Sequence, residues 1–352
     1  MSTPYFSVLV AAYNVDKYLD ECLTSLIQQT YLDAEFIVVD DASTDNTKQI
    51  CEGFAQRDVR FKLVRNEKNE GLLAVRKKAV KMARGQFVVF LDGDDCLAST
   101  EALSQLVECT KEHQADIYRF TVRSFGEDEK ECEAFSRWLN KKGLDRSCSL
   151  DILRDCYLSF YRSWTLWASC YRTDVLKRAY SEVVDERYTC NEDGYASFLI
   201  AYFANSYKVC DTSPIYAYRV GSGLTSGGVT CEKFIRNLEI SKCLEWLRVF
   251  LDKEEASVGH FQCLASFQRR VAAIYYGKLL EVPKEIVNNK GASVPFEVDL
   301  ALNVSKCRYK YPKISGFGAV DDVGKRPISL WHKQTPGILG VDFYPDRLYN
   351  IL

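Results

Sequence analysis

The chain has 352 residues, of which 47% are hydrophobic and 27% are charged, a composition typical of a folded globular protein and unlike that of a disordered or collagen-like chain. The formal net charge of -2, from 46 basic and 48 acidic residues, provides no strong field for a nucleic acid partner. At this length we expect one large α/β domain at residues 1–228 and a mainly helical C-terminal region at residues 229–352.

The cysteines and the hydropathy pattern bear on the cellular compartment. We expect the 14 cysteines to be reduced, partly buried thiols, because no apolar signal segment stands at the start of the sequence. No Cys-x-x-Cys pattern occurs, and the widely separated His113, His260 and His332 argue against a zinc cluster. No window approaches the roughly 18 apolar residues of a membrane span. The sequence thus predicts a cytoplasmic protein that at most lies against the inner face of a membrane.

Apolar runs and helical periodicities alternate through the first hundred residues. The predicted strands are Phe6–Ala12, Phe36–Val39, Phe61–Val64 and Gln86–Leu91. The predicted helices are Asp16–Gln29, Thr47–Gln56 and Leu72–Ala83. Asp16 is the expected N-cap of the first helix, and Gly85 is expected to end the third in the left-handed conformation. This alternation predicts a doubly wound, mostly parallel sheet with helices on both faces.

The periodicity is less regular beyond residue 115. Strand segments are predicted at Asp116–Val122, Trp164–Tyr171, Tyr207–Val209 and Ile215–Val220. A helix is predicted at Tyr195–Phe203, and two amphipathic helices are predicted between Glu232 and Leu280. The charged stretch Gly126–Arg146 is typical of a surface excursion. No clear period follows Pro283.

Acidic residues follow two of the predicted buried strands, at the strand ends where ligands bind in such sheets. In Asp92-Gly93-Asp94-Asp95 the carboxylates repel one another unless a cation lies between them, and Mg²⁺ or Mn²⁺ there would bridge a diphosphate. The alternative is a solvated turn, which the position at a strand end disfavours. Asp41 is suited to bind a base or a ribose, or to cap the next helix. Tyr13 would stack on a nucleobase or simply pack.

Four motifs in order resemble those of the family-2 glycosyltransferases of the GT-A fold. They are Ala12-Tyr13-Asn14, the segment from Val39 to Asp45, the segment from Asn69 to Arg76, and Asp92-Gly93-Asp94-Asp95. The resemblance implies a nucleotide-sugar donor bound by Ala12, Tyr13, Asp41, Arg76, Asp92, Gly93 and Asp94. It also implies that Asp92 and Asp94 reach a Mn²⁺ or Mg²⁺ ion.

Two later segments extend the resemblance. Asn191-Glu192-Asp193-Gly194 is similar to the family's Glu-Asp motif, which makes Asp193 the expected catalytic base and Glu192 the less favoured choice. Without the family, two acids before a helix would indicate only complementation of the helix dipole. The segment from Tyr218 to Thr225 is similar to one that often follows the base, and it implies that Arg219 steadies the diphosphate.

The resemblance predicts an inverting hexosyl- or N-acetylhexosaminyltransferase. It would move a sugar, expected from a UDP-sugar, to a hydroxyl of a glycan or lipid-linked acceptor in bacterial surface-polysaccharide synthesis. The C-terminal region would then bind the acceptor or a membrane surface. The rivals are a nucleotidyltransferase, a dehydrogenase and a non-catalytic nucleotide-sugar-binding or assembly protein. A dehydrogenase is disfavoured because no G-x-G-x-x-G follows the first strand.

Overall fold

A computed structural model describes residues 3–112, 114–140, 143–159, 163–188, 191–222 and 240–281. The chain forms two compact units, Met1–Gly228 with Arg236–Arg269, and Val229–Ile235 with Arg270–Leu352. Residues 236–269 therefore belong to the same unit as the predicted α/β domain. The predicted tail from Pro283 lies outside the described residues, so the role of the C-terminal region stays a prediction.

A seven-stranded sheet forms the centre of the first unit. Its strands are β1 (Phe6–Ala12), β2 (Ala34–Asp40), β3 (Phe61–Arg65), β4 (Phe87–Asp92), β6 (Ile117–Arg119), β8 (Ser169–Arg172) and β9 (Tyr207–Val209), in the order β3-β2-β1-β4-β8-β6-β9. Strands β3, β2, β1 and β4 are parallel, β8 is antiparallel to both of its neighbours, and β9 is parallel to β6. The mostly parallel α/β fold predicted from the sequence is confirmed.

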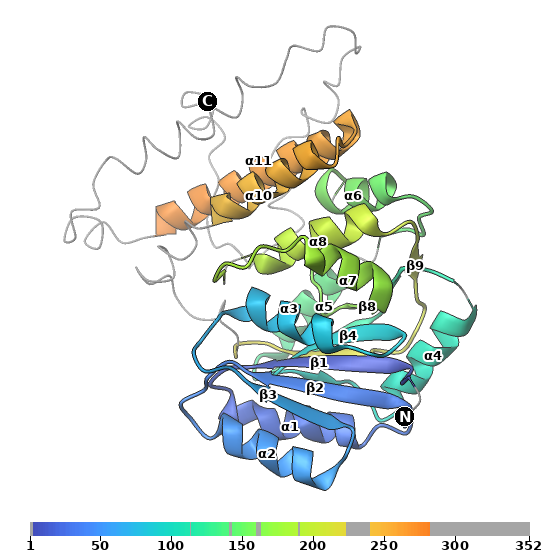
Figure 1. Cartoon of the computed structure of the whole chain (residues 1–352), viewed down its shortest axis with the longest axis vertical. Coiled ribbons are helices and arrows are strands. Elements are labelled where there is room, and N and C mark those ends of the chain that lie inside the picture. Colours follow the sequence, from blue (N-terminus) through green and yellow to red (C-terminus); the bar gives the residue numbers. More distant parts are fainter. Residues whose placement is uncertain are drawn as a thin grey trace, which may run out of the picture. The chain divides into compact units, whose positions relative to one another are not determined.

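Helices cover both faces of this sheet. Figure 1 shows α1 (Asp16–Ile27) and α2 (Thr47–Arg57) on one face, and α3 (Leu72–Met82) and α7 (Thr173–Ser181) on the other. Strands are added on one side of β1 up to β3, and β4 is then added on the other side of β1. Because each crossover is right-handed, the helices before and after this change lie on opposite faces of the sheet. Every residue of β2 is buried, as the continuous apolar runs predict for strands covered on both sides.

Two predicted helix ends differ from the structure. Asp16 is the first residue of α1, and Val15 occupies the N-cap position. Ala83 occupies the C-cap position of α3. Gly85 does not have a positive φ, so the left-handed conformation predicted for it is wrong. A glycine is needed there for another reason, since a Cβ at Gly85 would lie 2.5 Å from the backbone nitrogen of Ser7. The close approach of two backbones thus selects the glycine.

A small second sheet lies beside the first. It consists of β5 (Cys96–Leu97), β10 (Tyr216–Arg219) and β7 (Val122–Phe125), in the order β5-β10-β7. The predicted strand Asp116–Val122 is therefore wrong as one element, because β6 and β7 belong to different sheets. The predicted strand Trp164–Tyr171 is strand only from Ser169 onward.

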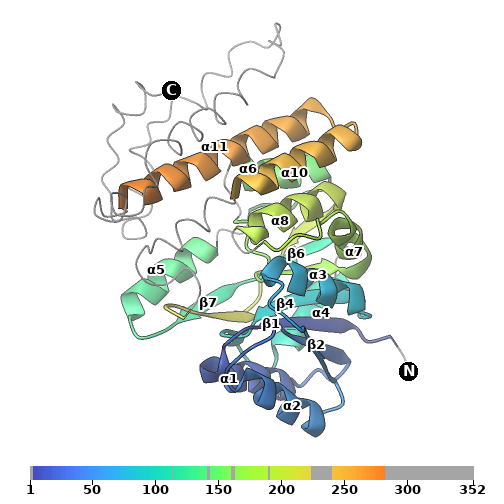
Figure 2. The same ribbon diagram turned by 60° about the vertical axis from the view of Figure 1, so that its left-hand side comes forward.

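The stretch expected to be a surface excursion contains α5 (Glu129–Leu139), which lies against β7 (Figure 2). The helix begins there because the Asp128 carboxylate accepts the backbone N–H groups of Lys130 and Glu131. The charged residues within α5 are exposed, whereas Cys132 and Leu139 are buried, so this part of the stretch is an amphipathic helix and not a loop.

The remaining helices complete the described part of the chain. They are α4 (Ala102–Glu112), α6 (Ser149–Tyr157), α8 (Glu192–Phe203), α10 (Ile240–Lys253) and α11 (Val258–Glu281). Helix α8 contacts α6, α7 and α10, and nine of its twelve residues are buried, so it is apolar on nearly all sides. Among the described residues, no helix combines the length and apolarity that crossing a membrane requires.

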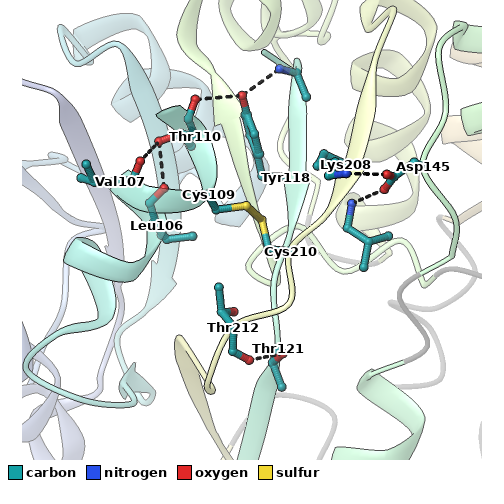
Figure 3. The surroundings of a disulfide bond; sticks show 12 residues. Leu106, Val107, Cys109, Thr110, Tyr118, Thr121, Asp145, Lys208, Cys210 and Thr212 are labelled. Atoms are coloured by element: carbon teal, nitrogen blue, oxygen red, sulfur yellow. Dashed lines mark hydrogen bonds and ion pairs between the residues drawn. A yellow bond between two sulfur atoms is a disulfide. The ribbon is translucent and has the colours of Figure 1, made fainter. Parts of the chain in front are cut away.

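A disulfide joins α4 to the segment that leads from β9 to β10. The sulfur atoms of Cys109 and Cys210 are bonded, and their Cα atoms lie 6.2 Å apart (Figure 3). The expectation of thiols throughout is therefore wrong for this pair. Of the other cysteines in the described residues, eight are buried and Cys148 is exposed. Widely spaced cysteines in a long chain gave no sign of which two would meet.

Replacing both Cys109 and Cys210 with Ala is expected to lower the free energy of unfolding by about 2–4 kcal/mol, because the bond closes a loop of 101 residues in the unfolded chain. Urea denaturation under non-reducing conditions measures this change. Reduced wild type should then match the double variant, and equal stability of oxidised wild type and variant would show that the bond is dispensable.

Candidate active site

The loops after β1 and β2 are held together by side chains from both. Asn14, in the left-handed region at φ 50, accepts the Thr44 backbone N–H with Oδ1 at 2.8 Å and donates its own N–H to Ser43 Oγ at 3.0 Å. Ala12, the neighbouring member of the first motif, is buried at the end of β1. Tyr13 is 46% exposed, so its ring is available to a ligand at this rim.

Asp41 is buried and its carboxylate is engaged within the protein. It accepts hydrogen bonds from Asn66 Nδ2 at 2.7 Å and from the backbone N–H groups of Glu70 and Gly71, each at 2.8 Å. Asp41 thereby holds the β3–α3 connection against the loop after β2. Asp45, rather than Asp41, accepts the N–H of Thr47 at the start of α2, at 2.9 Å. Base binding by Asp41 stays a prediction.

The acidic loop begins where β4 ends, at Asp92. Gly93 passes so close to β1 that a Cβ there would lie 2.9 Å from the carbonyl oxygen of Ala11. The Asp94 carboxylate accepts the Ser222 hydroxyl at 2.9 Å. Burial, followed by the charge of Asp92, raises the pKa of Asp94. Asp94 is thus a carboxylate that a nearby cation would stabilise.

Arg76 of α3 is the central cation of the site. Its side chain is only 3% exposed, and Nη2 donates to Asp92 Oδ1 at 3.0 Å. Nη1 donates to Asp193 Oδ1 and lies 3.5 Å from Glu192 Oε1. Burial alone would lower the pKa of Arg76, but these three acids raise it well above its ordinary value. A fixed positive charge therefore links the acidic loop after β4 to the start of α8.

Glu192 and Asp193 form the first turn of α8, directly after Asn191, which has a φ of 55. Burial and the neighbouring Asp193 raise the pKa of Glu192 to about 7, although Arg76 opposes the shift. Burial also raises the pKa of Asp193, and Asp92 adds to it against the opposing charge of Arg76. The Leu166 backbone N–H points at Asp193 Oδ2 from 3.5 Å. Glu192 is thus poised to exchange a proton near neutral pH, and the pKa of Asp193 is shifted in the same direction.

Arg219 reaches the same loop from β10. Its Nε donates to the carbonyl oxygen of Asp94 at 2.9 Å, and its guanidinium lies 4.4 Å from the ring centroid of Phe125. The structure therefore brings together six of the predicted site residues, namely Arg76, Asp92, Asp94, Glu192, Asp193 and Arg219. Within the described ranges, no three His, Cys, Asp or Glu side chains could hold a metal ion on their own.

Sequence reasoning missed three residues of the site. Tyr216 and Ser222 donate hydroxyl hydrogen bonds to Asp95 and Asp94, and the Leu166 amide faces Asp193. No short motif marks Tyr216 or Leu166, and Ser222 lies in the Tyr218–Thr225 segment, where only Arg219 was assigned a role. The one usable signal was the third acid of the loop, Asp95, which needs a partner when buried.

Glu192→Gln is expected to remove a pH dependence of stability. The folded-state pKa of about 7 lies above the unfolded value, so the folded protein binds more protons between them, and stability falls as pH rises from about 4.5 to 7. The variant should lose less stability across this range than wild type. Chemical denaturation at pH 5 and 7.5 measures the difference, and an unchanged pH dependence would contradict the environment described for Glu192.

The sheet order and the acidic strand-end loops define the GT-A fold of glycosyltransferases. A crystal structure of TarS 1-349 from Staphylococcus aureus with UDP-GlcNAc aligns with a TM-score of 0.57 and 22% identity, covering 86% of this chain and 80% of that one. A Pyrobaculum calidifontis mannosyltransferase, PcManGT, in complex with GDP-Man and Mn²⁺, aligns with a TM-score of 0.51 and 16% identity, covering 88% and 82%. These likenesses show the fold.

Residues 7–166, less than half of the chain, match the model of glycosyl transferase family 2. The uncharacterized glycosyltransferase EpsJ of Bacillus subtilis is 30% identical over 221 residues, 61% of each chain. TarS of S. aureus, a poly(ribitol-phosphate) beta-N-acetylglucosaminyltransferase, is 40% identical over 115 residues, 32% of this chain and 20% of TarS. The matched region thus spans less than two thirds of each of these relatives.

Proposed function

We propose that the protein is an inverting glycosyltransferase that transfers a hexose or N-acetylhexosamine from a UDP-sugar to a hydroxyl of a growing bacterial surface glycan. The observation that carries this proposal is the Arg76 cluster, in which one buried cation joins the loop of Asp92 to the acid Asp193. A donor-binding loop and a candidate base thereby share one site. The UDP-GlcNAc complex of TarS supports the donor class, and the TarS name supports the kind of acceptor.

Asp193 is the proposed catalytic base. It would accept the acceptor's hydroxyl proton while that oxygen bonds to the anomeric carbon and the bond from this carbon to the nucleotide's phosphate oxygen breaks on the opposite side. The result is inversion in one step. Arg76 and the Leu166 amide orient the Asp193 carboxylate. Its side chain is 19% exposed, against 13% for Glu192, which favours Asp193 as the acid that reaches the acceptor.

Asp92 and Asp94 fit a hard divalent cation. Both offer carboxylate oxygens, and burial together with the charge of Asp92 raises the pKa of Asp94, so a cation beside it would stabilise the charged form. Mg²⁺ commonly binds through one or two carboxylates together with substrate phosphates, so two protein ligands suffice. When bound, Mn²⁺ or Mg²⁺ would offset the charge that develops on the leaving diphosphate. The Arg219 side chain, which is held beside Asp94 and forms an ion pair with Glu21, is a further cationic group at this edge.

A thermal-shift screen of nucleotide sugars tests the proposal. UDP-GlcNAc, UDP-glucose and GDP-mannose are each added with Mn²⁺, Mg²⁺ or EDTA to wild type, to Asp94→Ala and to the surface control Glu52→Ala. A ligand that binds only the folded state raises its stability, so we expect a metal-dependent shift for one UDP-sugar that only Asp94→Ala loses. Absence of any shift in wild type would overturn the donor site. Conversion of a sugar 1-phosphate into a nucleotide sugar without transfer would instead favour a nucleotidyltransferase.

A further inference from the structure

Tyr216 lies on β10, and its hydroxyl contacts both ends of the acidic loop. The residue is fully buried, and its oxygen accepts the Asp92 backbone N–H at 3.2 Å. The same hydroxyl donates to Asp95 Oδ2 at 2.6 Å. One side chain from a distant part of the sequence therefore contacts the first and the last residue of the Asp92–Asp95 turn.

The carboxylate of Asp95 faces β10, unlike those of the other two acids in this turn. It is only 2% exposed, and its second carboxylate oxygen accepts the backbone N–H of Arg219 at 2.7 Å. Both oxygens of Asp95 thus bind β10, whereas Asp94 meets Ser222 and Asp92 meets Arg76. Because Asp95 is buried, removing either hydrogen bond would leave a carboxylate oxygen without a partner away from water, which is costly.

The ring of Tyr216 connects this turn to the base side of the site. It stacks on Trp167 with ring centroids 4.7 Å apart and an interplanar angle of 28°. Trp167 directly follows Leu166, whose amide faces Asp193. Strand β10 also pairs with β5, where Tyr216 lies opposite Leu97, two residues beyond Asp95. Tyr216 is therefore held on several sides and can serve as a rigid support for the turn.

We propose that Tyr216 and Asp95 form a positioning pair that sets the Asp92–Asp95 turn in the shape that binds the divalent cation and the donor diphosphate. The proposal rests on the donor site described under the proposed function. Tyr216 touches neither the cation nor the donor in this proposal. It acts through the Asp92 amide and the Asp95 carboxylate, as the hydrogen-bond partners behind metal ligands commonly do.

Tyr216→Phe tests the pair, because it keeps the ring and its stacking on Trp167 and removes only the hydroxyl. Mn²⁺ affinity is measured in the presence of UDP from the electron paramagnetic resonance signal of free Mn²⁺. We expect an affinity about 10–100-fold lower than that of wild type, the usual effect of removing such a partner. Tyr118→Phe is the matched control, since the buried Tyr118 hydroxyl accepts the Ala115 N–H in a different region, and its Mn²⁺ affinity should equal that of wild type.

Asp95→Asn provides a second variant, which decides the matter if Tyr216→Phe does not fold. It should also weaken Mn²⁺ binding. The Mn²⁺ affinity of the double variant should be little lower than that of whichever single variant binds more weakly, because the two residues act as one unit. Wild-type Mn²⁺ affinity in folded Tyr216→Phe, or in Asp95→Asn when the first variant cannot be purified folded, would overturn the positioning role alone. If the wild-type protein does not bind Mn²⁺ in the presence of UDP, both the proposed donor site and the positioning role of the pair are overturned.

Discussion

Asp193→Asn is expected to lower the rate of sugar transfer by about 10²–10⁴-fold, the usual contribution of a positioned general base. The substitution keeps the size of the side chain and one oxygen to accept from Arg76, so the donor side of the site should be unchanged. Nucleotide-sugar binding, followed by thermal shift, should therefore remain close to that of wild type. The defect should appear in kcat for transfer to the acceptor and not in donor affinity.

Glu192→Gln is the matched control for this experiment. It changes the adjacent acid in the same helical turn and also faces Arg76, at 3.5 Å. If Asp193 is the base, Glu192→Gln retains far more transfer than Asp193→Asn. Transfer at the wild-type rate by Asp193→Asn, or a larger loss in Glu192→Gln, would assign the base to another group.

The N-terminal half of the sheet could be predicted because its strands are buried on both faces. Such strands leave continuous apolar runs, and Phe6–Ala12 was predicted with the bounds that the structure gives. The second sheet was not predictable in the same way. Its strands have two to four residues. The predicted strand Ile215–Val220 corresponds to β10, but its partners lie more than ninety positions away, so periodicity and turn chemistry do not indicate which strands pair.

Six residues that the structure brings together at the candidate site were indicated by the sequence, but their contacts with one another were not. The resemblance placed Arg76 near the donor, whereas the structure shows this side chain between Asp92 and Asp193, which lie 16 and 117 residues away in sequence. That geometry depends on how α3 and α8 pack on the sheet, which a linear pattern does not encode. Tyr216 was missed for the same reason, because its partner Asp95 lies 121 residues away.

Arg76→Met is expected to destabilise the fold by about 3–5 kcal/mol at pH 8, because removing the buried cation leaves its carboxylate partners without compensation. Asp92, Glu192 and Asp193 all contact this guanidinium, so the variant also brings together acids that repel one another. Arg154→Met is the surface control. Its pair with Asp151 is about half exposed on both sides and should contribute less than about 1 kcal/mol.

The pH dependence of the Arg76→Met deficit distinguishes lost charge from lost packing. Without the cation, the pKa values of Glu192 and Asp193 in the folded protein should rise further, so the folded variant binds more protons than the unfolded chain and regains stability as pH falls from 8 to 5. Urea denaturation at both pH values measures this, and Arg76→Met combined with Glu192→Gln should recover part of the loss at pH 8. A deficit that stays the same at pH 5 and is unaffected by Glu192→Gln would mean that Arg76 stabilises the fold through packing of its side chain rather than through its charge.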